Sequence, residues 1–209
     1  LVEYLRGIVE KRRAAPRADL ISGLIAAQEA GDALDDDEIL GTCALVLGAG
    51  HETTTDAIAN GMLALLRDPA ALARLTREPE CVPSAVEELL RYDSPVQVTS
   101  RIALEPVVIR GQAIPAGQEV NTVIGAANRD PAHFPRPDEL VLDRADNRHL
   151  SFGHGAHFCL GAPLARLEAQ AAIGALVRRF PGMKLELEDP PRRPGFVLRG
   201  PTKLPVRLA

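Results

Sequence analysis

The sequence predicts a mainly α-helical protein with one long central helix and small β-sheets. Apolar residues recur at helical spacing over much of residues 1–92 and again over 160–180. Between positions 95 and 123, β-branched residues are grouped between Gly and Pro, a pattern typical of short strands. Hydrophobic residues make up 46% of the 209 residues and charged residues 25%, as in ordinary globular proteins.

Helices are expected first, over residues 1–13, 19–30, 37–67, 70–78 and 83–92. Gly31 stops the second helix and Pro69 ends the third. The third helix would contain about 31 residues and be about 46 Å long at 1.5 Å per residue. Its centre, 43–47, is apolar on all sides, which predicts a buried helix running through the middle of the fold.

The rest of the chain combines strands, loops and one more helix. After the strands of 95–123, residues 128–147 form an irregular Pro-rich stretch, and 149–161 form a loop rich in Gly. Two strand-like pieces, 184–187 and 203–208, close the chain. The helical pattern of 160–180 predicts a buried side that consists of Leu160, Leu164, Leu167, Ala171 and Leu176.

Charge and cysteine content narrow the possible function classes. The formal net charge is −4, and no nucleic-acid partner is expected because such partners need a basic surface. The longest apolar run, 39–50, is too short to cross a bilayer, so no membrane partner is expected. Cys43, Cys81 and Cys159 are odd in number and widely spaced, which indicates a reducing, cytoplasmic location rather than a disulfide framework.

Cys159 directly precedes the last predicted helix, in the Gly-rich loop. The helix dipole and unpaired backbone N–H groups would stabilise a thiolate there, and Gly155 and Gly161 would let the backbone approach the sulfur. A buried structural cysteine is one alternative. Zinc is another, because His154, His157 and Cys159 form an H-x-x-H-x-C cluster, but no C-x-x-C pair or fourth ligand accompanies it.

A polar cluster also interrupts the long apolar helix. Gly50 costs about 1 kcal/mol relative to Ala inside a helix, and Glu52 is costly beside apolar residues unless it is partnered. Local rules that are broken together often mark a functional site. A zinc-protease motif is excluded because its second His would fall at Thr55, whereas back-bonding of the Thr hydroxyls to helix carbonyls is a plain structural alternative.

Both segments resemble signatures of the cytochrome P450 family. The haem signature of that family, F-x-x-G-x-[HR]-x-C-x-G, is matched at every fixed position by Phe152, Gly155, His157, Cys159 and Gly161. The [AG]-G-x-[DE]-T motif of its central helix is matched by Ala49, Gly50, Glu52 and Thr53.

The resemblance implies that Cys159 is the axial ligand to the iron of haem b (iron protoporphyrin IX), where a thiolate favours O–O cleavage. It implies that His157 contacts a haem propionate and that Phe152 packs beside the sulfur. Arg101 falls where family members have a second propionate ligand, and an arginine has the bidentate geometry for a carboxylate. An ordinary surface arginine is the alternative.

In the long helix, the resemblance assigns a role to each residue of the motif. Ala49 and Gly50 would open a gap in the helix for O₂, and Glu52 and Thr53 would relay protons to it.

A Glu–Arg pair carries a further resemblance. Glu88 and Arg91 are three positions apart on one helix and match the E-x-x-R motif of the family, which forms a buried structural pair. Glu139 is a departure, because it stands where the family has a third charged partner, Arg or His. Arg136 and Arg144 are candidates to replace it. A glutamate at position 139 would not compensate the charge of Glu88, so a less stable core beside the haem is expected unless another cation replaces it.

The resemblance covers residues 1–209 and implies the C-terminal haem-binding portion of a soluble bacterial cytochrome P450 domain. The complete enzyme would activate O₂ to oxidise a hydrophobic small molecule, with electrons from NAD(P)H through a ferredoxin or a similar partner. Residues 45–49, 96–98 and 200–202 correspond to segments that line the substrate pocket. Arg166 could dock an acidic ferredoxin or be a solvated helix residue. A truncated, non-catalytic fragment or pseudoenzyme is the rival hypothesis.

Overall fold

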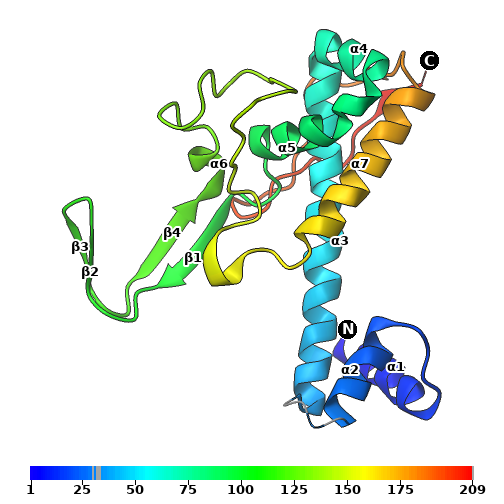
Figure 1. Cartoon of the computed structure of the whole chain (residues 1–209), viewed down its shortest axis with the longest axis vertical. Helices are drawn as coiled ribbons and strands as arrows, with labels where there is room; N and C mark the ends of the chain where they lie inside the picture. Colours follow the sequence, from blue (N-terminus) through cyan, green and yellow to red (C-terminus); the bar gives the residue numbers. More distant parts are fainter. Residues whose placement is uncertain (30, 32–33, 209) are drawn as a thin grey trace. The chain divides into compact units, whose positions relative to one another are not determined.

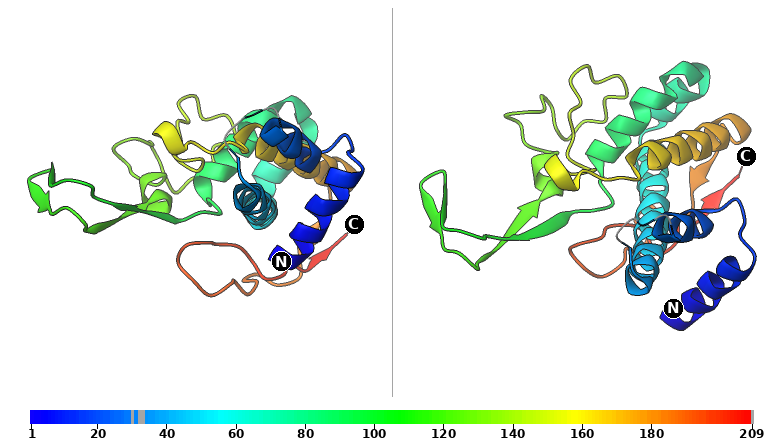
Figure 2. Two further views of the ribbon diagram at one scale, coloured as in Figure 1. Left: turned by 90° about the horizontal axis from the view of Figure 1, so that it is seen from below. Right: turned by 60° about the horizontal axis from the view of Figure 1, so that its bottom comes forward.

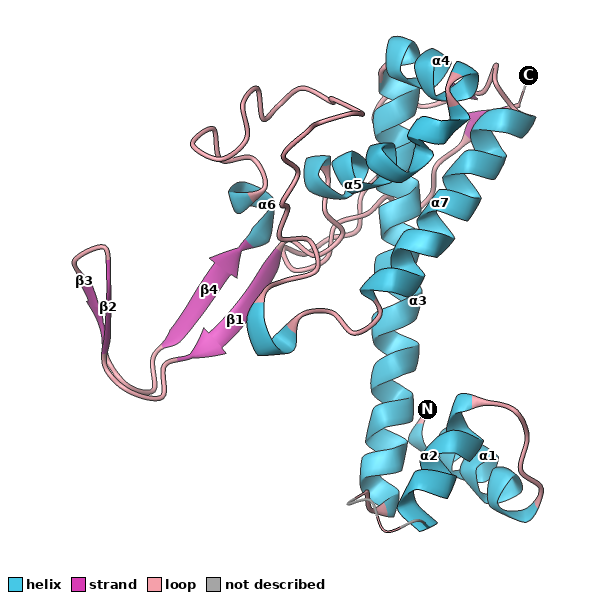
Figure 3. Ribbon diagram, viewed as in Figure 1, coloured by secondary structure: helices cyan, strands magenta, loops and turns pink. Residues whose placement is uncertain are grey.

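A computed structural model describes residues 1–29, 31 and 34–208 (Figure 1). The chain divides into two compact units, Leu1–Glu52 and Thr53–Ala209, and the long helix α3 (Asp36–Arg67) contributes to both. Helices and small antiparallel sheets make up the regular structure, as the sequence predicts (Figure 3). No helix among the described residues is long and apolar enough to span a membrane.

The first unit consists of three helical segments packed around a small apolar core. α1 (Val2–Ala14) and α2 (Leu20–Glu29) pack with the first turns of α3 (Figure 2). These bounds lie within one residue of the predicted 1–13 and 19–30, and Ala30 lies outside the described residues. The core consists of Leu5, Val9, Ile25, Ile39, Leu40 and Cys43.

The bounds of α3 follow from local signals at its two ends. Asp35 and Glu38 form a reciprocal capping box, in which each side chain accepts the other residue's backbone N–H at 2.8 Å. At the other end the helix stops at Arg67, two residues before Pro69. The prediction of 37–67 is therefore confirmed to within one residue.

The predicted burial of 43–47 is wrong for most of this stretch. Cys43 is buried, but Leu45, Val46 and Leu47 are 68%, 44% and 50% exposed. A helix that is apolar all round needs cover on every side. The described residues supply that cover only on the side of Cys43.

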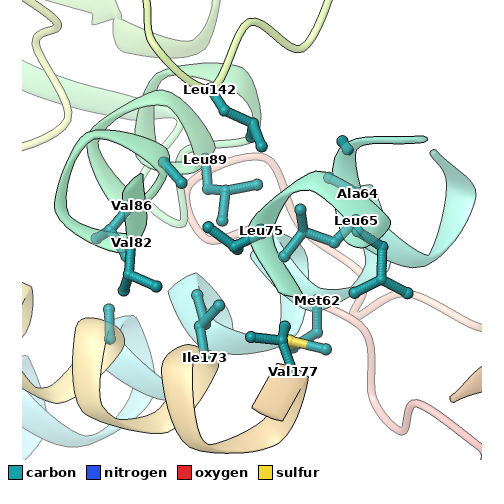
Figure 4. Close-up of a cluster of buried hydrophobic side chains, with 14 of the residues drawn as sticks. Met62, Ala64, Leu65, Leu75, Val82, Val86, Leu89, Leu142, Ile173 and Val177 are labelled. Carbon is teal, nitrogen blue, oxygen red and sulfur yellow. The ribbon is translucent and has the colours of Figure 1, made fainter. Parts of the chain in front are cut away.

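In the second unit, the end of α3 and three further helices enclose the main core (Figure 4). The helices are α4 (Pro69–Arg77), α5 (Val82–Tyr92) and α7 (Ala162–Arg179), close to the predicted 70–78, 83–92 and 160–180. A short 3₁₀ helix, η1 (Pro79–Cys81), joins α4 to α5. Buried members of the core include Met62, Leu65, Leu75, Val86, Leu89, Ile173 and Val177.

The predicted buried side of α7 is wrong. Leu160, Leu164 and Leu167 are 96%, 58% and 63% exposed, and Ala171 is also exposed, whereas Leu176 is partly buried. The helix instead buries the stripe of small and β-branched residues Ala162, Ala169, Ile173, Gly174 and Val177. This stripe packs on α5, and a Cβ added to Gly174 would lie 3.7 Å from a Val82 methyl, at van der Waals distance.

The strands of the described chain form three two-stranded antiparallel sheets. Arg110 and Gly111, with φ of 48° and 81°, form the tight hairpin turn of the second sheet. The short helix α6 (Ile124–Ala127) after the first sheet was not predicted. The strand pairs are β1 (Val98–Ile102) with β4 (Glu119–Val123), β2 (Val107–Ile109) with β3 (Gln112–Ile114), and β5 (Lys184–Leu185) with β6 (Val206–Arg207).

Candidate functional site

Cys159 lies in the 149–161 loop, called the Cys159 loop below, which contains the short 3₁₀ helix η2 (Gly155–His157) and leads into α7. Backbone hydrogen bonds within the loop fix its course. The Cys159 N–H donates to the Phe152 carbonyl at 2.9 Å. Gly153 and Gly155 have φ of 73° and 80°, in the left-handed region that favours glycine. Near the thiol, a Cβ added to Gly161 would lie 3.9 Å from the Cys159 Sγ. The loop therefore presents one thiol on a defined backbone.

The thiol of Cys159 is free and exposed among the described residues, unlike a structural cysteine packed in a core. Its sequence neighbours Phe158 and Leu160 are 50% and 96% exposed. Exposed apolar side chains beside a soft sulfur ligand suit a large apolar cofactor that carries a metal.

The donor set near Cys159 also limits what kind of metal it could bind. Among the described residues, no group of three or more His, Cys, Asp or Glu side chains could hold a metal ion, which excludes zinc at His154, His157 and Cys159. A metal that takes Cys159 as its one protein ligand needs further ligands from a cofactor. Haem iron, with four porphyrin nitrogens, fits this requirement.

The two expected propionate ligands both lie in the second unit and are exposed. His157 closes η2, two residues before Cys159. Arg101 lies on β1, where one guanidinium nitrogen donates to the Ser100 carbonyl at 2.8 Å. Their binding to propionates stays a prediction.

Comparison with known proteins decides the family. A family model described as "Cytochrome P450" matches residues 1–206. The chain belongs to the cytochrome P450 family. It spans about half the length of the curated relatives that it matches.

Two curated P450 relatives show how similar the chain is to other members of the family. The chain is 45% identical to the "Biotin biosynthesis cytochrome P450" of Bacillus subtilis (strain 168), over 97% of the chain and 51% of the relative. It is 44% identical to the 6-deoxyerythronolide B hydroxylase of Saccharopolyspora erythraea, over 100% of the chain and 52% of the relative. The family therefore includes hydroxylases similar to this chain.

Solved P450 structures share the fold of the chain. P450BioI, in complex with an acyl carrier protein that carries hexadec-9Z-enoic acid, matches with a TM-score of 0.94 and 44% identity, over 100% of this chain and 53% of that one. The tirandamycin C-bound P450 monooxygenase TamI matches with a TM-score of 0.95 and 41% identity, over 100% and 53%. The mainly helical P450 fold predicted from the sequence is confirmed.

The E-x-x-R pair of this P450 is buried as predicted. Arg91 donates to both carboxylate oxygens of Glu88, at 2.8 and 2.9 Å, and both side chains are fully buried. Arg144 supplies the third charge, with its Nε 3.0 Å from Glu88 Oε2, so of the two candidates to replace Glu139 it is Arg144 that reaches Glu88. Arg136 instead pairs with Glu139 at the surface, at 2.8 Å. Burial raises the pKa of Glu88, but Arg91 and Arg144 outweigh it and lower that pKa.

The [AG]-G-x-[DE]-T motif of the P450 family lies on α3. This helix runs without a break through Ala49, Gly50, Glu52 and Thr53. Glu52 is exposed, so the burial cost expected from the sequence does not arise. Thr53 is partly buried. The gap for O₂ and the proton relay stay predictions.

Sequence reasoning missed two residues beside the Cys159 loop, Glu87 and His149. Glu87 pairs with Arg166 at 2.7 Å and with His149 at 3.1 Å. Arg166 is therefore an ion-paired residue, not merely a solvated one, and a docking role for it stays a prediction. The partners are 79 and 62 positions from Glu87 along the chain, so no local pattern could reveal them.

Proposed function

We propose that the complete protein containing this chain is a haem-thiolate monooxygenase, and that residues 1–209 form the C-terminal haem-binding portion of its P450 domain. The observation that carries the proposal is the free, exposed thiol of Cys159 in a backbone-held loop at the start of α7. Haem b bound there would supply the oxygen-activating chemistry, the insertion of one atom of O₂ into an organic substrate.

The residues of the Cys159 loop have distinct tasks in this proposal. Cys159 ligates the iron as a thiolate, and Phe152 accepts its N–H and packs beside the sulfur. Gly155 allows the left-handed turn, and Gly161 leaves room near the sulfur. His157, together with Arg101, binds the propionates as a hydrogen-bond or charge partner.

The motif residues of α3 are proposed to make room for O₂ and to deliver protons to it. Ala49 and Gly50 keep the helix surface small where O₂ binds, and an added Cβ at Gly50 meets nothing within 4 Å. The Glu52 carboxyl and the Thr53 hydroxyl hold and pass protons, which a carboxyl–hydroxyl pair can do when water joins it. The family motif supports both assignments.

The substrate is proposed to be a hydrophobic small molecule. Leu45, Val46 and Leu47 are large, apolar and exposed, and the segments 96–98 and 200–202 are also expected to line the pocket. Relatives include a mycinamicin IV hydroxylase/epoxidase and a 6-deoxyerythronolide B hydroxylase, and these names support an organic small molecule as the substrate class. Electrons are proposed to come from NAD(P)H through a ferredoxin-type partner in the cytoplasm.

A carbon-monoxide difference spectrum of the reduced complete protein tests the proposal. Wild type should give the Soret band of a thiolate-ligated haem, and Cys159→Ala should lose it. Cys81→Ala is the matched control, because Cys81 lies in η1 and should leave the band unchanged. A wild-type band that survives Cys159→Ala contradicts the proposed ligand.

The rival function, a truncated chain without catalysis, predicts a different result. Residues 1–209 alone leave Leu160, next to Cys159, and Leu164 and Leu167, on α7, exposed, so we expect this piece to hold haem poorly. Stoichiometric haem with a stable low-spin spectrum from this piece alone would contradict that expectation. Absence of the thiolate band from the complete wild-type protein would favour the rival.

A further inference from the structure

A carboxylate on α5 links two side chains that pack beside the Cys159 loop. Arg166, on α7, donates to Glu87 through two nitrogens, Nε to Oε1 at 2.7 Å and Nη2 to Oε2 at 2.9 Å. His149, the first residue of the 149–161 loop, lies with its Nε2 3.1 Å from Glu87 Oε2. The two-pronged arginine contact has the geometry of a strong, oriented ion pair.

The hydrogen bonds of His149 determine which ring nitrogen carries the proton. Nδ1 accepts the backbone N–H of Ser151 at 3.2 Å. That nitrogen must therefore have a free lone pair, so the ring proton is on Nε2, which donates to Glu87. The His149 side chain is only 2% exposed, so Glu87 fixes a buried ring in one tautomer and one orientation.

Both partners of Glu87 pack on Phe152. The Arg166 guanidinium carbon lies 4.5 Å from the centre of the Phe152 ring, and the His149 ring centre lies 5.9 Å from it. The Phe152 carbonyl accepts the Cys159 N–H at 2.9 Å. Glu87 is thus connected to the thiol loop by two contacts on Phe152 and one backbone hydrogen bond.

Charge connects the same residues to the sulfur. The Glu87 carboxylate and, to a smaller extent, a negative charge at Cys159 raise the pKa of Arg166, so Arg166 and the sulfur interact electrostatically. Glu87 carries the opposite charge and offsets the guanidinium. Removing either member should therefore change the field at the sulfur, in opposite directions.

We propose that Glu87 and Arg166 are positioning residues for the Cys159 ligand, which hold Phe152 and with it the backbone partner of Cys159 in place, and set, through their opposed charges, how readily the bound iron is reduced. This inference rests on the proposed haem-thiolate function. Neither residue touches the reacting atoms, so neither is a catalytic residue.

The test is the reduction midpoint of the haem-loaded complete protein, measured for wild type, Glu87→Gln and Arg166→Gln. Glu87→Gln leaves the guanidinium uncompensated and should increase the reduced-to-oxidised ratio at a fixed potential on the order of fivefold. Arg166→Gln should decrease it by a similar factor. The exposed residues Glu168 and Arg178, also on α7, provide the controls Glu168→Gln and Arg178→Gln, which should change the ratio less than about twofold.

Arg166→Lys is a second test, because lysine keeps the positive charge but cannot make the two-nitrogen contact with Glu87. It should keep the ratio within about twofold of wild type while lowering the urea midpoint of unfolding, measured on the same samples. Shifts of the same sign in the two Gln variants would overturn the proposal, as would a shift in Arg166→Lys equal to that in Arg166→Gln. A wild type without the thiolate band would refute the haem-thiolate function itself, whereas a normal band with unchanged ratios refutes this inference alone.

Discussion

Arg144 donates to both oxygens of Glu88, from Nε to Oε2 at 3.0 Å and from Nη2 to Oε1 at 3.2 Å. Glu88 also accepts the Val141 N–H at 2.9 Å, so the fully buried carboxylate is surrounded by donors. Position 139 bears a glutamate whose side chain turns to the surface, and only its carbonyl joins the network, 3.2 Å from Arg91 Nη2. In this chain the third charge therefore comes from Arg144, five positions after Glu139.

Arg144→Gln should lower the free energy of unfolding by about 2–4 kcal/mol, because it leaves buried acceptors short of donors and the Glu88 charge less compensated. Arg136→Gln is the matched control. Its pair with Glu139 is more than half exposed on both sides, and should contribute less than about 0.5 kcal/mol. Urea unfolding of the complete protein measures both, and equal effects would show that Arg144 is not the third partner.

Gly200→Ala should destabilise the tail that lies on α3. A Cβ added to Gly200 would overlap the Asp56 carboxylate, which is 1% exposed and paired with Arg193 at 2.8 Å. Because the carboxylate is held in place, we expect a loss of about 2 kcal/mol or more. Gly23→Ala in α2 is the control, since its Cβ meets nothing and the change should raise helix stability by up to about 1 kcal/mol. Thermal unfolding that ranks the two variants in the opposite order would contradict this reading.

Local signals in the sequence predicted the elements well. Pro69 marked the end of α3, and the Gly residues around Cys159 marked a loop that does contain left-handed backbone. The prediction of the buried side of α7 was wrong because two apolar stripes run along that helix. The stripe with large leucines was favoured over the stripe that contains Ala169 and Gly174. Only the tertiary packing on α5 selects the stripe with small residues.

The polar networks were less predictable, because their members come from distant parts of the chain. Arg144 is 56 positions from Glu88, and two candidates could equally have taken its role. For the same reason the exposure of Leu45 and Leu47 could not be predicted from an apolar pattern. Such a pattern reports that a helix face requires cover, but not which residues provide it.

Thr53→Val tests the proposed proton relay on α3. The substitution keeps the shape and removes the hydroxyl, so the enzyme should bind haem and reduce normally but form less product per NAD(P)H consumed, by about tenfold or more. Thr54→Val makes the same change one residue later, about 100° around the helix, and should leave that ratio within about twofold of wild type. Product and NAD(P)H are measured together with a substrate found by screening. Equal losses in both variants would indicate helix packing rather than a relay.

The cluster of Glu87, Arg166 and His149 should make the stability of the fold depend on pH between about 4.5 and 2. Burial alone would raise the pKa of the Glu87 carboxyl, but hydrogen bonds from His149 and Arg166 outweigh it and lower that pKa from 4.5 to about 2. Since the folded-state pKa is depressed, the contribution to stability is fully present above the unfolded value of about 4.5 and is lost as the pH falls toward 2. The shift corresponds to about 3 kcal/mol at most. Glu87→Gln cannot titrate there, so the difference in unfolding free energy between wild type and variant should shrink from pH 6 to pH 3. A difference that stays constant over this range would show that the carboxylate is not stabilised by its partners in the folded protein.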